Sequence, residues 1–283
     1  MSRRGRVIKD YCGYYLVECS LQIFRCRCRG NLSLSVVTGD EVVFHEMNSE
    51  EGRIEAVVER RVLLAKPPVA NVDLVLLINT FVEPAFDSLV LDRHLASIDI
   101  PLWIVHTKAD LGVDRTWIEL YAALGYPCFT VSAQNGSGLA ELKGALQGKT
   151  AVLVGQSGVG KSMLVNALAG AWLQRVNALS LKIKRGRQTT RFVELFNVGP
   201  DTYVADAPGF TYGHLPQCAE DLQMIFPELR QRFGQCRFNN CLHRDEPDCI
   251  IRNAVTQGVL APSRYQSYLV LLKDVEKHAR QHR

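Results

Sequence analysis

Short apolar or alternating segments follow one another in the first 66 residues. Four of them lie at 14–19, 21–28, 40–45 and 53–60. They are rich in β-branched and apolar residues, and turn signals such as Gly39-Asp40 and Glu51-Gly52 separate them. Because no helical pattern comes between them, these residues predict a small β-barrel. The Lys-Pro-Pro sequence at 66–68 then predicts a linker.

Strand and helix patterns alternate from residue 71 onward. Continuous apolar runs, typical of buried strands, lie at 72–78, 102–106, 151–154 and 202–205. Helical spacing is found between some of them, at 87–97, 116–124 and 162–169. This alternation predicts an α/β domain with a mainly parallel sheet.

The alternation stops near residue 227, where a stretch rich in cysteine and histidine begins. A final helix is expected from Pro262, because Tyr265, Tyr268, Leu272 and Val275 recur at helical spacing. The chain therefore divides into three expected domains: 1–66, 67–226 and 227–283.

Composition adds little to this picture and excludes a few classes. The 283 residues are 47% hydrophobic and 22% charged, with a net charge of +4. No apolar run reaches the roughly 18 residues of a membrane-spanning helix, and the basic start lacks the apolar core of a signal peptide. We expect a cytoplasmic protein with no membrane partner. Nine cysteines in a chain of this size point to buried, reactive or metal-bound thiols rather than disulfides.

A phosphate-binding loop is the strongest motif in the chain. Residues 155–162 fit G-x-x-x-x-G-K-S and lie between an apolar strand and a helical segment. In such a loop main-chain N–H groups surround the phosphates, Lys161 reaches the β- and γ-phosphates, and Ser162 ligates Mg²⁺. The expected nucleotide contacts in this loop are Gly155, Gln156, Ser157, Gly158, Val159, Gly160, Lys161, Ser162 and Met163.

Two segments at strand ends predict that the base is guanine. The sequence Thr107-Lys108-Ala109-Asp110 fits [N/T]-K-x-D, in which the carboxylate accepts from two N–H groups of guanine and the lysine stem covers the ring. The pair Ser132-Ala133 supplies a main-chain N–H for the guanine O6 atom, which adenine lacks. Neither segment is specific alone, but together with the phosphate loop they favour GTP and GDP.

The switch segments are expected downstream of the phosphate loop. Asp206 and Gly209 belong to a D-x-x-G sequence, where an aspartate of the Mg²⁺ site and a glycine N–H facing the γ-phosphate are found. Thr189 and Thr190, in the basic loop 182–191, offer a hydroxyl for the same Mg²⁺. Because the base-reading segments precede the phosphate loop, the order of motifs indicates a circularly permuted GTPase domain.

Four potential zinc ligands are clustered within fourteen residues. Cys236, Cys241, His243 and Cys249 form a Cys₃His set, which suits one tetrahedral structural Zn²⁺ with no open position for catalysis.

Taken together, these motifs resemble the RsgA (YjeQ) family of GTPases that depend on the small ribosomal subunit. The similar residues include 26–30, 91–95, 186–190, 206–210 and 246–249. The resemblance implies an OB-fold, a permuted GTPase domain and a zinc module. It further implies partners, namely the small ribosomal subunit and its rRNA, and a role in late subunit maturation in which GTP hydrolysis is coupled to release. We expect a monomer.

Three residues depart from the family pattern. Thr107 replaces the usual Asn, and Ala207 replaces the frequent Thr of D-T-P-G. Gln188 stands where the family usually has a His thought to position the attacking water. Since Phe210 cannot orient water, we hypothesise that Gln188 does so, with Lys161 and Thr190 as the other catalytic residues.

Two other functions remain open at this point. One is a GTP-gated rRNA-binding assembly factor in which hydrolysis is incidental, and the other is a P-loop ATPase with a zinc appendage.

RNA binding is suggested by basic residues on three segments. They are Arg25, Arg27 and Arg29, the loop 182–191, and Arg230, Arg232, Arg237 and Arg244.

Overall fold

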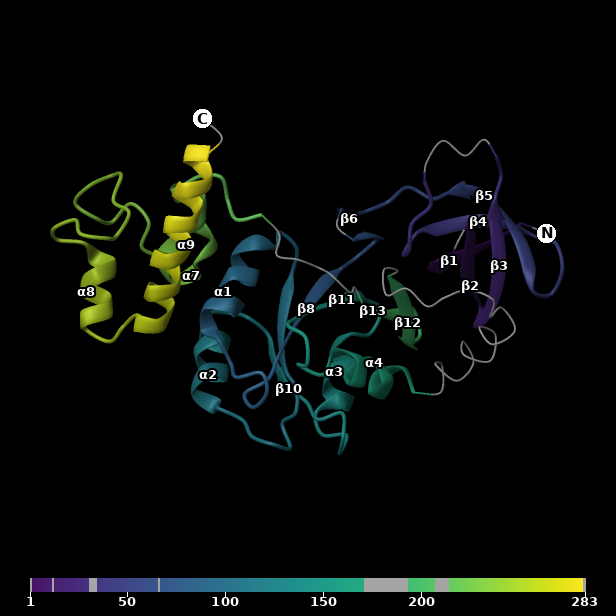
Figure 1. Ribbon diagram of the computed structural model, residues 1–283, viewed down its shortest axis with the longest axis horizontal. Coiled ribbons are helices and arrows are strands. Elements are labelled where there is room, and N and C mark those ends of the chain that lie inside the picture. Colours follow the sequence, from purple (N-terminus) through teal and green to yellow (C-terminus); the bar gives the residue numbers. More distant parts are fainter. Residues whose placement is uncertain are drawn as a thin grey trace. The chain divides into compact units, whose positions relative to one another are not determined.

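The computed structural model describes residues 2–11, 13–30, 35–65, 67–170, 193–206 and 214–281 (Figure 1). The chain forms two compact units. The first contains residues 1–84, 103–113 and 129–211, and the second contains residues 85–102, 114–128 and 212–283. The predicted residues Gln188, Thr189, Thr190, Ala207, Gly209 and Phe210, with the rest of the basic loop, lie outside the described residues.

The N-terminal part of the first unit is a five-stranded barrel. Its strands are β1 (Ser2–Tyr11), β2 (Tyr14–Cys19), β3 (Gln22–Cys28), β4 (Glu41–Glu46) and β5 (Glu51–Val57). The order β1-β2-β3-β5-β4 is closed by pairing of β1 with β4, and β3 and β5 run parallel. Alternate residues such as Val17, Phe24, Phe44 and Ile54 are fully buried and form the barrel core. The predicted barrel is thus confirmed, with an additional first strand.

A short hairpin follows the barrel. It consists of β6 (Leu63–Ala65) and β7 (Pro68–Ala70), which pair antiparallel. The last residue of the expected linker, Pro68, thus belongs to a strand. Gly39 has a φ of +93°, and a Cβ atom there would lie 2.2 Å from the carbonyl oxygen of Ala70. The turn before β4 therefore needs glycine in order to approach this hairpin.

A six-stranded sheet follows, almost wholly within the first unit. Its strands are β8 (Leu74–Asn79), β9 (Leu102–His106), β10 (Cys128–Thr130), β11 (Thr150–Val154), β12 (Glu194–Gly199) and β13 (Thr202–Asp206). Their order is β10-β9-β8-β11-β13-β12, with β11 parallel to both β8 and β13. Helices α3 (Leu139–Ala145) and α4 (Lys161–Ala169) contribute Leu142, Leu164 and Leu168 to its apolar core. The predicted α/β fold is confirmed.

The second unit is helical. Its helices are α1 (Ser88–Ser97), α2 (Arg115–Ala123), α6 (Ala219–Ile225), α7 (Pro227–Arg230), α8 (Ile250–Thr256) and α9 (Pro262–Gln281). The carboxylates of Asp87 and Asp114 cap the first two by accepting main-chain N–H groups. Leu222, Phe226, Tyr268 and Leu272 form the core of this unit. The terminal helix therefore uses the apolar face that its spacing predicted.

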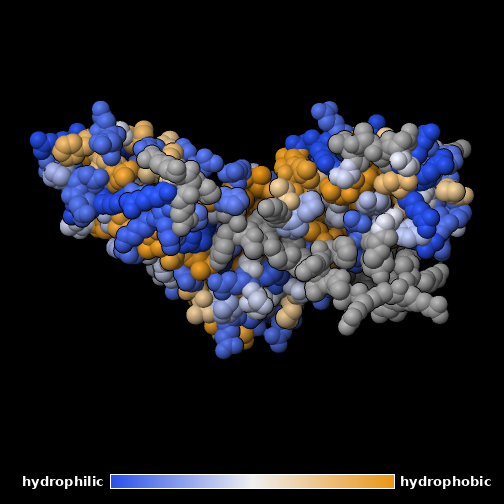
Figure 2. All heavy atoms as spheres, turned by 45° about the horizontal axis from the view of Figure 1, so that its top comes forward, coloured by the Kyte–Doolittle hydropathy of each residue, from blue (hydrophilic) through white to orange (hydrophobic). Residues whose placement is uncertain are grey.

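Hydrophilic and hydrophobic side chains are interspersed on the face shown in Figure 2. Leu21, Met47 and Val259 are exposed, and exposed apolar side chains are usual on folded domains. Within the described part of the chain, no helix combines the length and the apolar character needed to cross a membrane.

Candidate functional site

The phosphate loop joins the fully buried strand β11 to helix α4, as predicted. Its first glycine, Gly155, passes so close to β8 that a Cβ atom would lie 2.3 Å from the carbonyl oxygen of Ile78. Gly160, with a φ of +93°, is the N-cap residue immediately before α4. These two positions require glycine, one because of space and the other because of its backbone conformation. The loop thus lies at the carboxyl ends of the parallel strands β8 and β11.

Three predicted residues meet beside this loop. The Lys161 ammonium donates to the carbonyl oxygens of Gly155 and Gln156, both at 2.7 Å. Asp206, the last residue of β13, accepts a side-chain hydrogen bond from Ser162. Burial raises the pKa of Asp206, and the nearby Lys161 and Ser162 oppose this shift. A hydroxyl and a carboxylate side by side are hard oxygen donors that suit Mg²⁺.

The predicted base-reading residues come from the ends of β9 and β10. Ala109 N–H donates to the carbonyl oxygen of Val131 at 3.2 Å, which joins the two segments. Ser132 is fully buried, and its hydroxyl accepts from the N–H groups of Gln134 and Asn135 at 3.2 and 3.3 Å. The Ser132 side chain thus shapes the turn that presents Ala133.

Asp110 is exposed, in contrast to Ser132. Lys108, with a φ of +56°, extends its ammonium to the carbonyl oxygen of Glu83 at 2.6 Å. Its side chain also lies 4.0 Å from the point that a Cβ atom on Gly160 would occupy. The lysine stem therefore lies between the base-reading segment and the phosphate loop.

Thr107 connects the base-reading segment to the phosphate loop in a way that the motif did not predict. Its buried hydroxyl lies 3.0 Å from the carbonyl oxygen of Asn79 and also hydrogen-bonds to that of Val159 in the phosphate loop. The predecessor of Thr107, His106, is buried and stacks on Phe81 at a centroid distance of 4.6 Å. Burial lowers the pKa of His106 to about 4, so the ring is neutral at physiological pH.

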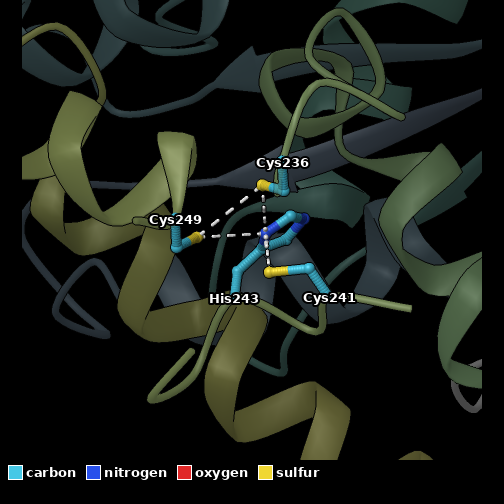
Figure 3. Close-up of side chains that lie close together, drawn as sticks. All are labelled: Cys236, Cys241, His243 and Cys249. Carbon is cyan, nitrogen blue, oxygen red and sulfur yellow. Dashed lines mark hydrogen bonds between the residues drawn. The ribbon is translucent and has the colours of Figure 1, made fainter. Parts of the chain in front are cut away.

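The four cysteine and histidine residues are brought together in the second unit (Figure 3). Their ligand atoms all lie within 4.8 Å of one another. The Nδ1 atom of His243 lies 3.6, 3.4 and 3.3 Å from the sulfurs of Cys236, Cys241 and Cys249. A tetrahedral zinc ion separates such sulfur and nitrogen ligands by about 3.6 Å, so the donor set and its spacing fit Zn²⁺.

Residues outside the motif hold this cluster in place. Glu246 accepts main-chain N–H groups from Leu242 and Arg244, both at 2.7 Å, and so closes the turn around His243. His243 has a φ of +61°, an uncommon conformation for a residue with a side chain. The hydroxyls of Tyr265 and Tyr268 on α9 donate to the carbonyl oxygens of residues 243 and 242. Their helical spacing predicted burial, but their hydrogen bonds only emerge in three dimensions.

An arginine-rich face lies on the barrel. Arg25 and Arg27 of β3 alternate with the buried Cys26, and both guanidinium groups lie over the ring of Tyr14, at 5.1 and 4.4 Å. Arg25 also pairs with Glu51. The predicted arginines of the zinc segment include Arg237, paired with Asp248, and Arg244, paired with Glu276. Arg237 also lies over the ring of Phe238, at 5.7 Å. The barrel differs in that two guanidinium groups share one ring, that of Tyr14.

Comparisons with known proteins cover nearly the whole chain. The family model for the RsgA N-terminal domain matches residues 4–54, and the one for the RsgA GTPase matches residues 57–215. A small ribosomal subunit biogenesis GTPase RsgA from Carboxydothermus hydrogenoformans is 36% identical over 98% of this chain and 99% of its own. A protein of the same name from Moorella thermoacetica is 38% identical over 96% and 97%.

Two solved structures are similar to this fold. The circularly permuted GTPase YloQ has a TM-score of 0.76 and 30% identity, and the alignment covers 98% of this chain and 96% of that one. YjeQ from Thermotoga maritima has a TM-score of 0.71 and 31% identity, over 97% and 99% of the two chains.

Proposed function

Since this chain belongs to the RsgA family of GTPases, we propose that it binds the small ribosomal subunit, hydrolyses GTP when stimulated by it, and is released by hydrolysis late in subunit maturation. That it is a GTPase follows from the family. The observation that carries the proposal is the meeting of Lys161, Ser162 and Asp206 at the strand ends, with Thr107 joining the base-reading segment to the same loop.

Binding of the nucleotide is assigned to residues of the first unit. Lys161 and the N–H groups of the phosphate loop would hold the β- and γ-phosphates, and Ser162 and Asp206 would hold Mg²⁺, directly or through water. When bound, Mg²⁺ neutralises charge that develops on the phosphate oxygens. Asp110, Lys108 and the N–H of Ala133 would select guanine.

Catalysis is proposed to need residues of the basic loop 182–191 and of the D-x-x-G sequence. Thr189 or Thr190 would complete the ligands of Mg²⁺, Gly209 would contact the γ-phosphate, and Gln188 would position the attacking water. These roles are inferred from the sequence motifs alone. Replacement of Gln188 by Ala should reduce subunit-stimulated hydrolysis and leave GDP affinity unchanged. Unchanged stimulated turnover would remove Gln188 from the mechanism.

The flanking domains are proposed to bind RNA and to provide a fixed scaffold. We assign RNA binding to residues 1–66, GTP hydrolysis to 67–226, and a structural Zn²⁺ with the terminal helix to 227–283. Tyr14 with Arg25 and Arg27 supports RNA binding, because an aromatic ring beside guanidinium groups suits stacking on unpaired bases and contact with phosphates. The protein would act as a monomer in the cytoplasm.

The deciding experiment is multiple-turnover GTP hydrolysis with purified small subunits, large subunits or neither. We expect stimulation by small subunits alone, weaker at higher salt because phosphate contacts release counterions. Equal rates in all three would overturn the proposal. Single-turnover assays with and without small subunits add a second distinction. Hydrolysis that small subunits do not accelerate would favour the assembly-factor alternative, in which GTP occupancy is the signal and hydrolysis is incidental.

A further inference from the structure

The first strand of the barrel, β1, also pairs with β12 at the edge of the six-stranded sheet. Lys9 of β1 is the antiparallel partner of Glu194 in β12, and the Lys9 ammonium lies 2.6 Å from the Glu194 carboxylate. Their side chains are only 24% and 20% exposed. Glu194 is in turn the antiparallel partner of Asp206 in β13. Lys9, Glu194 and Asp206 therefore form one row across three neighbouring strands.

Two further contacts join the barrel to β12. The buried hydroxyl of Thr38 donates to the carbonyl oxygen of Val193, the residue before Glu194, at 3.2 Å. The amide of Asn197 donates to the carboxylate of Glu18 at 3.0 Å, and both side chains are buried. Polar contacts thus hold β12 on both sides of its middle.

Arg6 of β1 reaches past β12 to the neighbouring strands. The Arg6 guanidinium donates to the Thr150 hydroxyl of β11 at 2.7 Å and lies 4.7 Å from the ring centre of Tyr203 in β13. Thr150 and Tyr203 are themselves partners in the parallel pair of β11 and β13. Arg6 therefore holds β13 near its beginning, while the Lys9 row meets it at its last residue.

These polar contacts matter because the barrel and the sheet have separate apolar cores. Phe24, Phe44 and Ile54 belong to the barrel core, whereas Leu76 and Leu153 belong to the core of the sheet. A groove of about 850 Å³ lies between them, lined by residues of both parts, such as Arg4, Glu18, Asn197 and Asp201. Along this edge the position of β12 relative to the barrel thus depends on ion pairs and hydrogen bonds.

We propose that the ion pair of Lys9 and Glu194 is a positioning contact through which the barrel sets the place of Asp206, and thereby the strengthening of nucleotide binding by Mg²⁺. The inference rests on the proposed role of Asp206 as a residue of the Mg²⁺ site. A slip of one residue along a strand turns each side chain to the opposite face of the sheet. A contact that keeps Lys9 opposite Glu194 therefore keeps β12 in register. The register of β12 in turn fixes the position of Asp206, because Glu194 of β12 pairs with Asp206 of β13.

The test uses the full-length protein and a fluorescent GDP analogue whose affinity is measured with and without Mg²⁺. Mg²⁺ should raise the affinity for the GDP analogue by a certain factor in the parent protein. In Lys9→Glu and in Glu194→Lys we expect this factor to be about fivefold smaller, a typical size for coupling between sites. The affinity without Mg²⁺ should stay the same. The double variant, in which the charges are exchanged, should recover the enhancement.

The ion pair of Arg3 and Glu46 provides a matched control. Its atoms are 3.0 Å apart and its side chains are 29% and 32% exposed, but it joins β1 to β4 within the barrel. Arg3→Glu should keep the full enhancement by Mg²⁺. If a charge reversal prevents folding, as seen by circular dichroism, the neutral variants Lys9→Gln and Glu194→Gln take its place in the same assay.

The outcomes separate this inference from the proposed function. If Asp206→Asn keeps the full enhancement of nucleotide affinity by Mg²⁺, the assigned role of Asp206 is overturned, and this inference with it. An enhancement lost in Asp206→Asn but intact in the Lys9 and Glu194 variants would overturn the inference alone. Failure of the double variant to recover would also overturn it, because the effect would then not come from the pair.

Discussion

His243 and Gln223 face each other across 3.1 Å, from the imidazole Nε2 atom to the side-chain oxygen Oε1. The amide of Gln223 donates to the carbonyl oxygen of Cys241 at 3.3 Å, which turns its oxygen toward the ring. The imidazole must then donate from Nε2, and its Nδ1 lone pair is left facing the three cysteine sulfurs. Gln223, which lies on α6 and is buried, thus selects the tautomer that a metal requires.

Zinc affinity should therefore depend on Gln223. We expect Gln223→Met to weaken Zn²⁺ binding about tenfold or more, the usual effect of losing a hydrogen bond to a ligating histidine. Competition with a chromogenic zinc chelator would measure it. Gln257→Met is the control, because Gln257 is exposed at the end of α8. Equal zinc affinity in the two variants would show that the ring orientation does not need Gln223.

Thr107 should contribute to guanine-nucleotide affinity through the phosphate loop. Thr107→Val keeps the shape of the side chain but removes the hydroxyl that bonds to Val159, a loss of about 1 kcal/mol or fivefold in affinity. Thr107→Ser keeps the hydroxyl and should bind nearly as the parent does. Titration of a fluorescent GDP analogue compares them. If Val and Ser variants bind equally, the contact with the loop does not support binding.

Acid should destabilise the first unit through His106. Its pKa is lowered by burial to about 4, whereas an exposed imidazole titrates near 6.5. At pH 5 the unfolded chain therefore binds a proton that the folded chain does not, and stability falls by about 2 kcal/mol between pH 7 and pH 5. His106→Phe can keep the stacking on Phe81 and should remove this loss. Urea unfolding at both pH values measures the difference; parallel losses in the two proteins would contradict it.

Arg264 should be indispensable for the stability of the second unit. Its guanidinium is 2% exposed, bonds to Glu228 at 2.7 Å and to Asp92, and lies 4.5 Å from the ring centre of Phe226. Arg264→Met leaves two buried carboxylates without their cation, at a cost of about 3–5 kcal/mol. Thermal or urea unfolding would measure this loss.

The matched control for Arg264 is Arg93, which pairs with Asp274 at 2.5 Å where the side chains are 26% and 35% exposed. Arg93→Met should cost only about 1 kcal/mol or less, because water can solvate the remaining carboxylate. Similar losses for both variants would mean that burial of the Arg264 cluster is not what makes it costly to disrupt.

The sequence predicted the features whose residues lie close together along the chain. The phosphate loop lies within eight residues between an apolar strand and a helix, and local backbone geometry suffices to place Lys161 and Ser162. The Cys₃His set is likewise contained in fourteen residues. In contrast, β1 was not predicted, because its sequence is basic rather than alternating. It becomes a strand because β2 and β4 pair with its two edges.

Long-range partners were decided by the tertiary structure alone. Arg264 is a charged residue on a helix whose other polar residues suggest a solvated face, yet it is buried because α1 and α7 bring Asp92 and Glu228 to it. Thr107 meets Val159 across 52 residues, and Lys9 meets Glu194 across 185. A side chain's position along the chain determines its neighbours within a turn or a strand. The distant groups that pair with this side chain depend on how the helices and strands pack. Only packing removes both partners from water together.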